Sequence, residues 1–424
     1  MNLIRKNVLS VSAFIFGMIT LSSVQVASQT PPEVPRAEWV GSASVPSYVK
    51  MYIHVPSKLA AKPPIVVSIH ACQSSVSGQV SANAKIKAAA DKNGFIMIFP
   101  DNPGRNCWDV GSPQALAHDK GGDPHAIAQM VRYALKKYNA DSTRVYAVGG
   151  SSGAMMTQAL LGVYPEIFTA GAPRAGVACG CWAVEYEKSG TAQWSGPCAS
   201  GTVTKTAEQW GSLVRAINPN YSGHRPRVMI FHGESDQTIK FQNFNESIKE
   251  WTNVLGLSTT PDSTDKISPP AAGYAYNRKF WKNKCGYVVL QAWSAPGQPH
   301  SMNYEEDAIL KFFGLDIAGG QDPEIAADCT GIGREQKIAE SHKWFFIKDN
   351  TLVLNTIKAE DISVKIVNTL GQIQCSGNYK INASVSFLSI PLSSLPSGYY
   401  IVSVVFNSNK GQSKCSNYRF VITK

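Results

Sequence analysis

The sequence predicts an α/β protein with a mostly parallel sheet, followed by a small C-terminal β-sandwich. Between residues 48 and 314, short apolar runs typical of buried strands alternate with segments of helical pattern. A glycine-rich turn at 149–153 joins one strand directly to a helix. From residue 343 onward, short β runs separated by turn residues replace the helical segments. Because 44% of the residues are hydrophobic and 17% are charged, the chain has enough apolar material for a core, which excludes wholesale disorder.

The predicted strands of the first part are of two kinds. Met51, Ile53 and Val55 alternate with polar residues, which indicates a half-exposed strand. The other strands are continuous apolar runs, as in a sheet covered on both faces: Ile65–Ile69, Phe95–Phe99, Arg144–Val148, Arg227–Phe231 and Tyr287–Trp293. Helices are predicted between them at Ala82–Lys92, Asp123–Tyr138, Ala154–Val163, Phe241–Leu255 and Tyr304–Phe313. On such a sheet, ligands bind beyond the carboxyl ends of the strands.

Four segments follow from these patterns. Arg5 and Lys6 precede an apolar stretch and then small residues, which is the pattern of a signal peptide over residues 1–28. An uncleaved anchor is the alternative, although the apolar stretch is short for a membrane span of about 20 residues. Residues 37–317 form the α/β domain and 318–342 a linker. The β-sandwich covers 343–424, with strands predicted at Trp344–Ile347, Thr351–Leu354, Val364–Val367, Tyr399–Phe406 and Tyr418–Ile422. We therefore expect a secreted or cell-surface protein.

The composition narrows the partners and cofactors. The formal net charge of +10 comes from scattered residues, so nucleic-acid binding is not expected, and an anionic polysaccharide or a membrane surface is a weaker alternative. No CxxC pair, HExxH or His-rich tract is present, so neither a metal nor another cofactor is predicted. Nine cysteines in an exported chain favour disulfides, and the odd number leaves at least one unpaired.

The glycine-rich turn has the pattern of a nucleophile. Gly149-Gly150-Ser151-Ser152-Gly153 fits G-x-S-x-G, with Ser151 at the centre. The two outer glycines leave room where a sharp strand-to-helix turn brings the strand and helix together. The serine hydroxyl then projects above the sheet, and the N-terminus of the helix favours negative charge there. A purely structural turn is the alternative, but a good strand before the turn and a good helix after it favour a nucleophile.

A serine needs an adjacent base, and in this arrangement an acid and then a histidine follow it along the chain. Asp236, after the strand Arg227–Phe231, is the candidate acid, with Glu234 as the alternative. Of the histidines that follow Asp236, His342 lies at the end of the linker. His300 comes directly after the strand Tyr287–Trp293 and is the candidate base. An ordinary loop histidine and an Asp236 that only caps a turn remain the alternatives.

Acyl transfer also requires donors for the carbonyl oxygen as it becomes negative. One candidate is the backbone N–H of Ser152, directly after the nucleophile. The other is the N–H of Cys72, on the loop after the strand Ile65–Ile69. A buried free thiol with no such role is the alternative for Cys72.

The first part resembles the fungal-type acetylxylan esterases of carbohydrate esterase family 1, whose relatives include feruloyl esterases and polyhydroxybutyrate depolymerases. The matching stretches run in order through residues 48–314: MYIHVP, IVVSIHACQ, GFIMIFP, NCWDVGS, DSTRVYAVGGSSGAMMTQ, YPEIF, AGVACGCW, NPNYSGHRPRVMIFHGESD and GQPHSM. The resemblance implies an α/β-hydrolase fold and a triad of Ser151, Asp236 and His300. It also implies disulfides Cys72–Cys107 and Cys181–Cys198.

Some features depart from the family or stay unassigned. Ala71 stands where many relatives carry glycine in the oxyanion loop. Cys179, Cys285 and Cys329 have no assigned partners, and a Cys285–Cys329 bond would leave Cys179 free.

The last 80 or so residues resemble the C-terminal sorting domain of type IX secretion substrates, on the stretches VKIVNTLGQIQ, IPLSSLPSGYYIVSV and YRFVITK. The type IX machinery is then an expected partner. A carbohydrate-binding β module is the alternative. A disulfide Cys375–Cys415 is predicted to stabilise this part.

The expected substrate is acetylated xylan. Trp108 and Asp109 follow one cysteine and Trp182 follows another, on loops expected near the site, and exposed Trp faces suit sugar rings. A core tryptophan next to a disulfide is the alternative for each. The resemblance favours a secreted serine esterase that removes acetyl groups through an acetyl-enzyme. Feruloyl esterase or polyhydroxybutyrate depolymerase activity on the same triad, and a non-catalytic polysaccharide-binding protein, are the alternatives.

Overall fold

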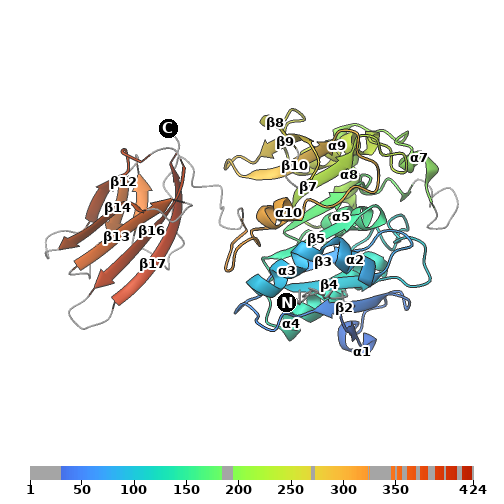
Figure 1. The fold of residues 1–424 in the computed structure, drawn as a ribbon, viewed down its shortest axis with the longest axis horizontal. Helices are drawn as coiled ribbons and strands as arrows, with labels where there is room; N and C mark the ends of the chain where they lie inside the picture. Colours follow the sequence, from blue (N-terminus) through green and yellow to red (C-terminus); the bar gives the residue numbers. More distant parts are fainter. Residues whose placement is uncertain are drawn as a thin grey trace, which may run out of the picture. The chain divides into compact units, whose positions relative to one another are not determined.

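The structure is a computed structural model of the chain, and it divides into two compact units (Figure 1). It describes residues 30–183, 194–268, 273–322 and 324, and, in the C-terminal part, 345–348, 351–355, 361–368, 373–380, 387–395, 398–407 and 413–422. The first unit comprises Met1–Asn283 and Val288–Ile325, and the second Lys284–Tyr287 and Ala326–Lys424. The predicted signal peptide, 1–28, lies outside the described residues. Among the helices of the described ranges, none is long and apolar enough to cross a bilayer.

The first unit is built on a ten-stranded sheet in the order β1-β2-β4-β3-β5-β6-β7-β10-β9-β8. The six strands from β4 to β10 in that order are parallel, and the strands outside them are antiparallel. This confirms the mostly parallel sheet. The strands are β1 (Glu33–Val34), β2 (Lys50–His54), β3 (Ile65–Ile69), β4 (Ile96–Asp101), β5 (Val145–Gly150), β6 (Ala170–Arg174), β7 (Arg227–Gly233), β8 (Ser263–Ile267), β9 (Tyr276–Lys282) and β10 (Val288–Ala295).

Helices cover both faces of this sheet, because its central strands are apolar on both sides. On β4, Ile96 and Ile98 belong to one buried cluster, whereas Met97 and Phe99 belong to the other. The first cluster contains residues of α4 (Asp123–Lys137), α5 (Ser152–Val163), α8 (Ala207–Ile217) and α9 (Gln242–Val254). The second contains residues of α2 (Val76–Ala82), α3 (Ala84–Asn93) and α10 (Glu306–Phe313). The short helices α1 (Arg36–Trp39) and α7 (Gly196–Ala199) complete the unit.

The helix predicted at Ala82–Lys92 is part of a pair, α2 and α3, that breaks at Asn83. The Asn83 side chain is buried and accepts hydrogen bonds from Ser68 Oγ at 2.7 Å and Gln79 Nε2 at 3.1 Å. Helix α3 ends at Asn93, and its C-cap Gly94 has a φ of 77°. A Cβ there would lie 2.6 Å from the backbone nitrogen of Ala60, so the turn requires glycine.

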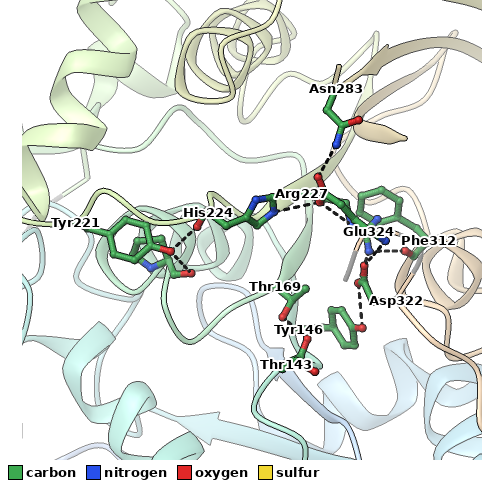
Figure 2. A network of polar contacts seen from close by, with 11 residues as sticks. Thr143, Tyr146, Thr169, Tyr221, His224, Arg227, Asn283, Phe312, Asp322 and Glu324 are labelled. Atoms are coloured by element: carbon green, nitrogen blue, oxygen red, sulfur yellow. Dashed lines mark hydrogen bonds and ion pairs between the residues drawn. The ribbon is translucent and has the colours of Figure 1, made fainter. Parts of the chain in front are cut away.

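A buried polar network closes the first unit at the amino ends of its strands (Figure 2). Arg227, which begins β7, donates to Asp322 and to the carbonyl of Phe312 at 3.0 Å. The Tyr146 hydroxyl donates to Asp322 at 3.0 Å. Glu324 accepts from Asn283 at 2.8 Å. The linker predicted from residue 318 is therefore wrong at its start, because Asp322 and Glu324 form ion pairs with Arg227 and belong to the first unit. The sequence did not show this, because these contacts do not depend on a helix or strand pattern.

The second unit contains two antiparallel sheets, which is the arrangement that a small β-sandwich requires. One has the order β11-β12-β15, with β11 (Phe345–Lys348), β12 (Thr351–Asn355) and β15 (Phe387–Pro391). The other has the order β14-β13-β16-β17, with β14 (Ile373–Lys380), β13 (Asp361–Asn368), β16 (Gly398–Asn407) and β17 (Ser413–Ile422).

The predicted disulfide Cys375–Cys415 is wrong. Cys375 lies on β14 and is a free thiol, whereas Cys415 lies on β17 at the opposite edge of the same sheet. Three strand spacings of about 4.8 Å separate these edges by about 14 Å. A disulfide requires Cα atoms within about 7 Å. The sequence does not show the order of the strands in the sheet, and that order decides whether Cys375 and Cys415 can form a disulfide.

Candidate active site

Ser151 occupies the strained turn between β5 and α5. Its φ is 55° and its ψ is −121°, a conformation that costs a non-glycine residue about 1–3 kcal/mol. A Cβ on Gly149 would lie 2.3 Å from the Gly153 carbonyl oxygen, and a Cβ on Gly153 would lie 2.2 Å from that of Ile69. Both outer glycines are therefore required by the close approach of strand and helix. The turn places Ser151 at the N-terminus of the fully buried helix α5, where the helix dipole favours negative charge.

His300 and Asp236 are joined on neighbouring loops. His300 Nδ1 lies 2.7 Å from Asp236 Oδ2. The two loops follow the parallel strands β10 and β7 and are held together by the bond from Ser235 N–H to the Gln298 carbonyl, at 3.0 Å. A Cβ on Gly233 would lie 2.3 Å from the same carbonyl oxygen, so glycine permits this contact.

Asp236 is held in its ionised form. The backbone N–H of Thr238 and that of Ile239 both donate to Asp236 Oδ1, at 2.8 and 2.9 Å. His232 Nε2 lies 3.3 Å from its Oδ2. Burial alone would raise the pKa of Asp236. The hydrogen bonds with His232, His300 and Ile239 and the charge of His300 outweigh burial, and they hold that pKa well below its usual range.

The alternative acid, Glu234, is bound to strands β9 and β10 rather than to His300. Its Oε1 accepts from Ser294 Oγ at 2.7 Å and from Asn277 Nδ2 at 3.0 Å. Nε2 of the buried His232 lies 2.8 Å from the Ile239 carbonyl oxygen.

Arg174 contacts both Ser151 and the loop of His300 at the carboxyl ends of the strands. The Ser151 N–H donates to the Arg174 carbonyl at 2.9 Å. Arg174 Nη1 in turn donates to the His300 carbonyl, also at 2.9 Å. Within the described ranges, no hydrogen bond joins Ser151 Oγ to the His300 ring. Such catalytic bonds often tighten only when a substrate binds.

The two expected oxyanion donors lie on loops that are tied together. The disulfide Cys72–Cys107 joins the loop after β3 to the loop after β4. Trp108 N–H then donates to Ser152 Oγ at 2.9 Å. Among the described residues, neither the Cys72 N–H nor the Ser152 N–H has a hydrogen-bond acceptor, so both can serve a ligand. In this loop, the residue with a positive φ, 54°, is Gln73 rather than Ala71. The backbone at position 71 therefore does not require glycine.

The three residues predicted to bind sugar do not offer exposed faces. Trp108 is 3% exposed and donates from Nε1 to the His70 carbonyl at 2.9 Å. Trp182 is 7% exposed. The Asp109 carboxylate accepts from Gly111 N–H, Ser112 N–H and Ser112 Oγ. The exposed indole faces expected of Trp108 and Trp182 are therefore wrong, whereas sugar binding by the half-buried Asp109 stays a prediction.

Trp194, which the sequence reasoning missed, is 46% exposed. Its ring packs edge-to-face on Trp182, with centroids 5.3 Å apart. Trp182 lines a small gap together with Met155, which lies one helical turn after Ser151. The disulfide Cys181–Cys198 brackets Trp194 in sequence, which was the available signal.

The remaining cysteines fit the expected pattern in part. Cys179 is a buried free thiol. Cys285, which the sequence left without an assigned partner, is disulfide-bonded, and Cys329 lies outside the described residues. In the described parts of the chain, no group of three or more His, Cys, Asp or Glu side chains is arranged to hold a metal ion.

Comparisons with known proteins match both units. Residues 80–252 match the model of the prolyl oligopeptidase family, and residues 348–416 match the secretion system C-terminal sorting domain. Feruloyl esterase B of Thermothelomyces thermophilus is 40% identical over 271 residues, covering 64% of this chain and 89% of the relative. Acetylxylan esterase A of Aspergillus oryzae is 39% identical over 272 residues, covering 64% and 85%. The solved acetyl xylan esterase from Aspergillus awamori has 36% identity and a TM-score of 0.60, covering 67% of this chain and 98% of that one.

Proposed function

This chain belongs to the family of acetylxylan and feruloyl esterases, which are carboxylic ester hydrolases, and from that premise we propose that it removes acetyl groups from xylan with Ser151, His300 and Asp236. One observation carries the proposal. The pair His300–Asp236, 2.7 Å apart, lies at the edge of the sheet where the strained turn presents Ser151.

In the first half of the reaction, His300 Nε2 takes the proton of Ser151 Oγ. The oxygen forms a bond to the acetyl carbonyl carbon, and the carbonyl oxygen becomes negative. The N–H groups of Ser152 and Cys72 stabilise this charge, and the loss of one such donor costs about 2.7–4 kcal/mol of transition-state stabilisation. The bond to the sugar oxygen then breaks, and His300 returns the proton to that oxygen.

In the second half, His300 takes a proton from water, and the hydroxide attacks the acetyl-enzyme. Acetate leaves as Ser151 recovers its proton. Asp236 remains ionised throughout, because its hydrogen bonds keep its pKa low, and it stabilises the His300 imidazolium and fixes its tautomer.

Trp194 is the proposed contact for the polysaccharide. Its ring is exposed and packs against that of Trp182. Pyranose rings pack well on exposed aromatic faces. The C-terminal sorting domain supports export, and we propose that the type IX machinery recognises it. The predicted signal peptide, 1–28, is proposed to start that route.

Feruloyl ester hydrolysis is the second candidate, because feruloyl esterase B of Thermothelomyces thermophilus is 40% identical to this chain. The same triad serves both reactions, and only the acyl group differs. Turnover of acetylated xylan and of methyl ferulate by the same preparation separates the two.

The decisive experiment measures acetate release from acetylated xylan by the wild type and by Ser151→Ala. We expect a loss of about 10⁴-fold or more in kcat. Ser142→Ala, an exposed serine before β5, is the control and keeps full activity. Equal rates for Ser151→Ala and the wild type refute the assignment. Xylan binding without any ester turnover supports the non-catalytic alternative.

A further inference from the structure

Arg174, the last residue of β6, connects the nucleophile turn to the loop of the base. We propose that Arg174 is a positioning residue: its guanidinium sets the place of His300 relative to Ser151. This inference rests on the proposed function, and it adds a residue that the sequence motifs do not identify.

The contacts of Arg174 reach both sides of the site. Its backbone carbonyl accepts from the Ser151 N–H at 2.9 Å, and its Nη1 donates to the His300 carbonyl at 2.9 Å. The guanidinium lies over the ring of Tyr304, 4.5 Å from the centroid. Tyr304 follows His300 by four residues, so the guanidinium holds the base loop at two points.

Gly150 leaves the space through which this side chain passes. A Cβ on Gly150 would lie 2.3 Å from Arg174 Nη2 and 2.7 Å from the Tyr304 hydroxyl. The first x of the G-x-S-x-G pattern, which Gly150 occupies, is open to many residues in principle, yet here it lies directly against the guanidinium. The glycine at 150 and the arginine at 174 therefore form one arrangement, on the adjacent strands β5 and β6.

The end of β6 is itself fixed. Arg174 pairs with Gly150 on one side and with Phe231 of β7 on the other. The next residue, Ala175, has a φ of 55° and donates from its N–H to the Phe231 carbonyl at 2.8 Å. The guanidinium thus extends from a rigid point between the strand that carries Ser151 and the strand that leads to Asp236.

His300 needs such a support because Asp236 fixes only its ring. Within the described residues, the bond from Arg174 is the hydrogen bond that holds the His300 backbone. An arginine stays charged at every working pH, so this bond persists while the imidazole gains and loses a proton. Misplacement of a reacting group by about 1 Å costs about 10²-fold in rate.

The test uses Arg174→Met and Arg174→Lys with p-nitrophenyl acetate, an ester that lacks the polysaccharide. We expect Arg174→Met to lower kcat about 10²-fold and to leave KM nearly unchanged. Arg174→Lys keeps a donor but loses the planar guanidinium, so its kcat is expected to lie between those of the wild type and Arg174→Met. If Arg174→Met does not fold, Tyr304→Leu removes the ring beneath the guanidinium and is expected to give a smaller loss in kcat.

Two comparisons separate positioning from a general structural role. Arg144, directly before the amino end of β5, also donates to backbone carbonyls, those of Gly320 and Lys62. It lies at the end of the strand opposite to Ser151, so Arg144→Met is expected to keep kcat. In a His300→Ala background, Arg174→Met is expected to cause no further loss, since there is no base left to position.

A kcat for Arg174→Met within about threefold of the wild type overturns the inference. An additional loss of the same size in the His300→Ala background overturns it as well. Full activity of Ser151→Ala would instead refute the proposed function, whatever Arg174→Met does, so the two failures are distinguishable.

Discussion

The two ends of the central sheet use buried charged groups in opposite ways. Strand β5 carries Tyr146 near its amino end and leads into Ser151 at its carboxyl end. Strand β7 begins at Arg227 and leads to Asp236. At the amino end, Arg227 binds Asp322 and Glu324, near the end of the first unit, and these ion pairs hold that segment against the sheet. At the carboxyl end, Asp236 binds histidines beside a strained serine.

Backbone strain is present at the carboxyl ends of three strands. Five non-glycine residues of the described ranges have a positive φ, and three of them, Gln73, Ser151 and Ala175, follow β3, β5 and β6, whereas Asp119 and Asn139 lie before and after α4. Strained backbone of this kind persists where the surrounding structure determines it, and it gathers at sites that bind or react. The same strands therefore support stability at one end and chemistry at the other.

The largest expected effect comes from His300→Ala. Its kcat falls about 10⁴- to 10⁶-fold, because Ser151 then lacks a base. The measurement is acetate release under saturating substrate. The control is Arg227→Met, at the amino end of the sheet. Assayed well below the unfolding temperature of this variant, it is expected to have the kcat of the wild type. A large loss of kcat in Arg227→Met would break the comparison.

Arg227→Met is expected to have the largest effect on stability. Arg227 and Asp322 are both almost completely buried, so removal of the arginine leaves an unpaired buried carboxylate and lowers the free energy of unfolding by about 3–5 kcal/mol. Denaturant unfolding followed by tryptophan fluorescence measures this, since all but one of the nine tryptophans precede residue 300. The double variant Arg227→Met/Asp322→Asn regains part of the loss. Equal stability of Arg227→Met and the wild type contradicts the prediction.

The sequence predicts the candidate triad because three simple facts agree. The G-x-S-x-G pattern fixes Ser151, chain order places the acid and base after it, and parallel strands bring Asp236 and His300 to one edge. The mostly parallel sheet follows from the same continuous apolar runs. Geometry in the structure also selects Asp236 over Glu234, which the sequence left open.

Other features depend on packing that no local pattern encodes. Arg174 reaches His300 across 126 positions, and the direction of its side chain is set by neighbouring strands. The burial of Trp108 and the exposure of Trp194 depend on how the disulfide-linked loops fold back. Cys375 and Cys415 lie in one sheet, yet strand order separates them.

Asp123 sharpens the comparison at the carboxyl end, because it is a buried acid without a salt bridge. Burial raises its pKa to about 6 from 3.8, against hydrogen bonds from Tyr48 and the Asp109 N–H. The stability that its neutral form provides is complete below pH 3.8 and is lost as the pH rises through about 6. Between pH 4 and 7.5, the unfolding free energy of Asp123→Asn should therefore gain about 2–3 kcal/mol on that of the wild type.

Urea unfolding of both proteins across this pH range measures the gain. Asp141→Asn is the matched control, because this carboxylate is bound by Thr143 and Arg144 rather than by a histidine. Burial alone would raise the pKa of Asp141, but the bonds with Thr143 and Arg144 outweigh burial and lower it, so its contribution is complete above its ordinary value and is lost only as the pH falls further. The difference between Asp141→Asn and the wild type should stay nearly flat from pH 4 to 7.5. A flat difference for Asp123→Asn would contradict the assignment.

The smallest effect concerns the strain at Ser151. Ser151→Gly and Ser151→Ala both remove the hydroxyl, but only glycine adopts a φ of 55° and a ψ of −121° without a steric cost. Relief of strain, reduced by the greater entropy of glycine in the unfolded chain, should make Ser151→Gly about 1 kcal/mol more stable than Ser151→Ala. Paired denaturant unfolding of the two variants checks this. If Ser151→Ala proves equal or more stable, the carboxyl end of the sheet does not carry the strain that distinguishes it from the Arg227 end.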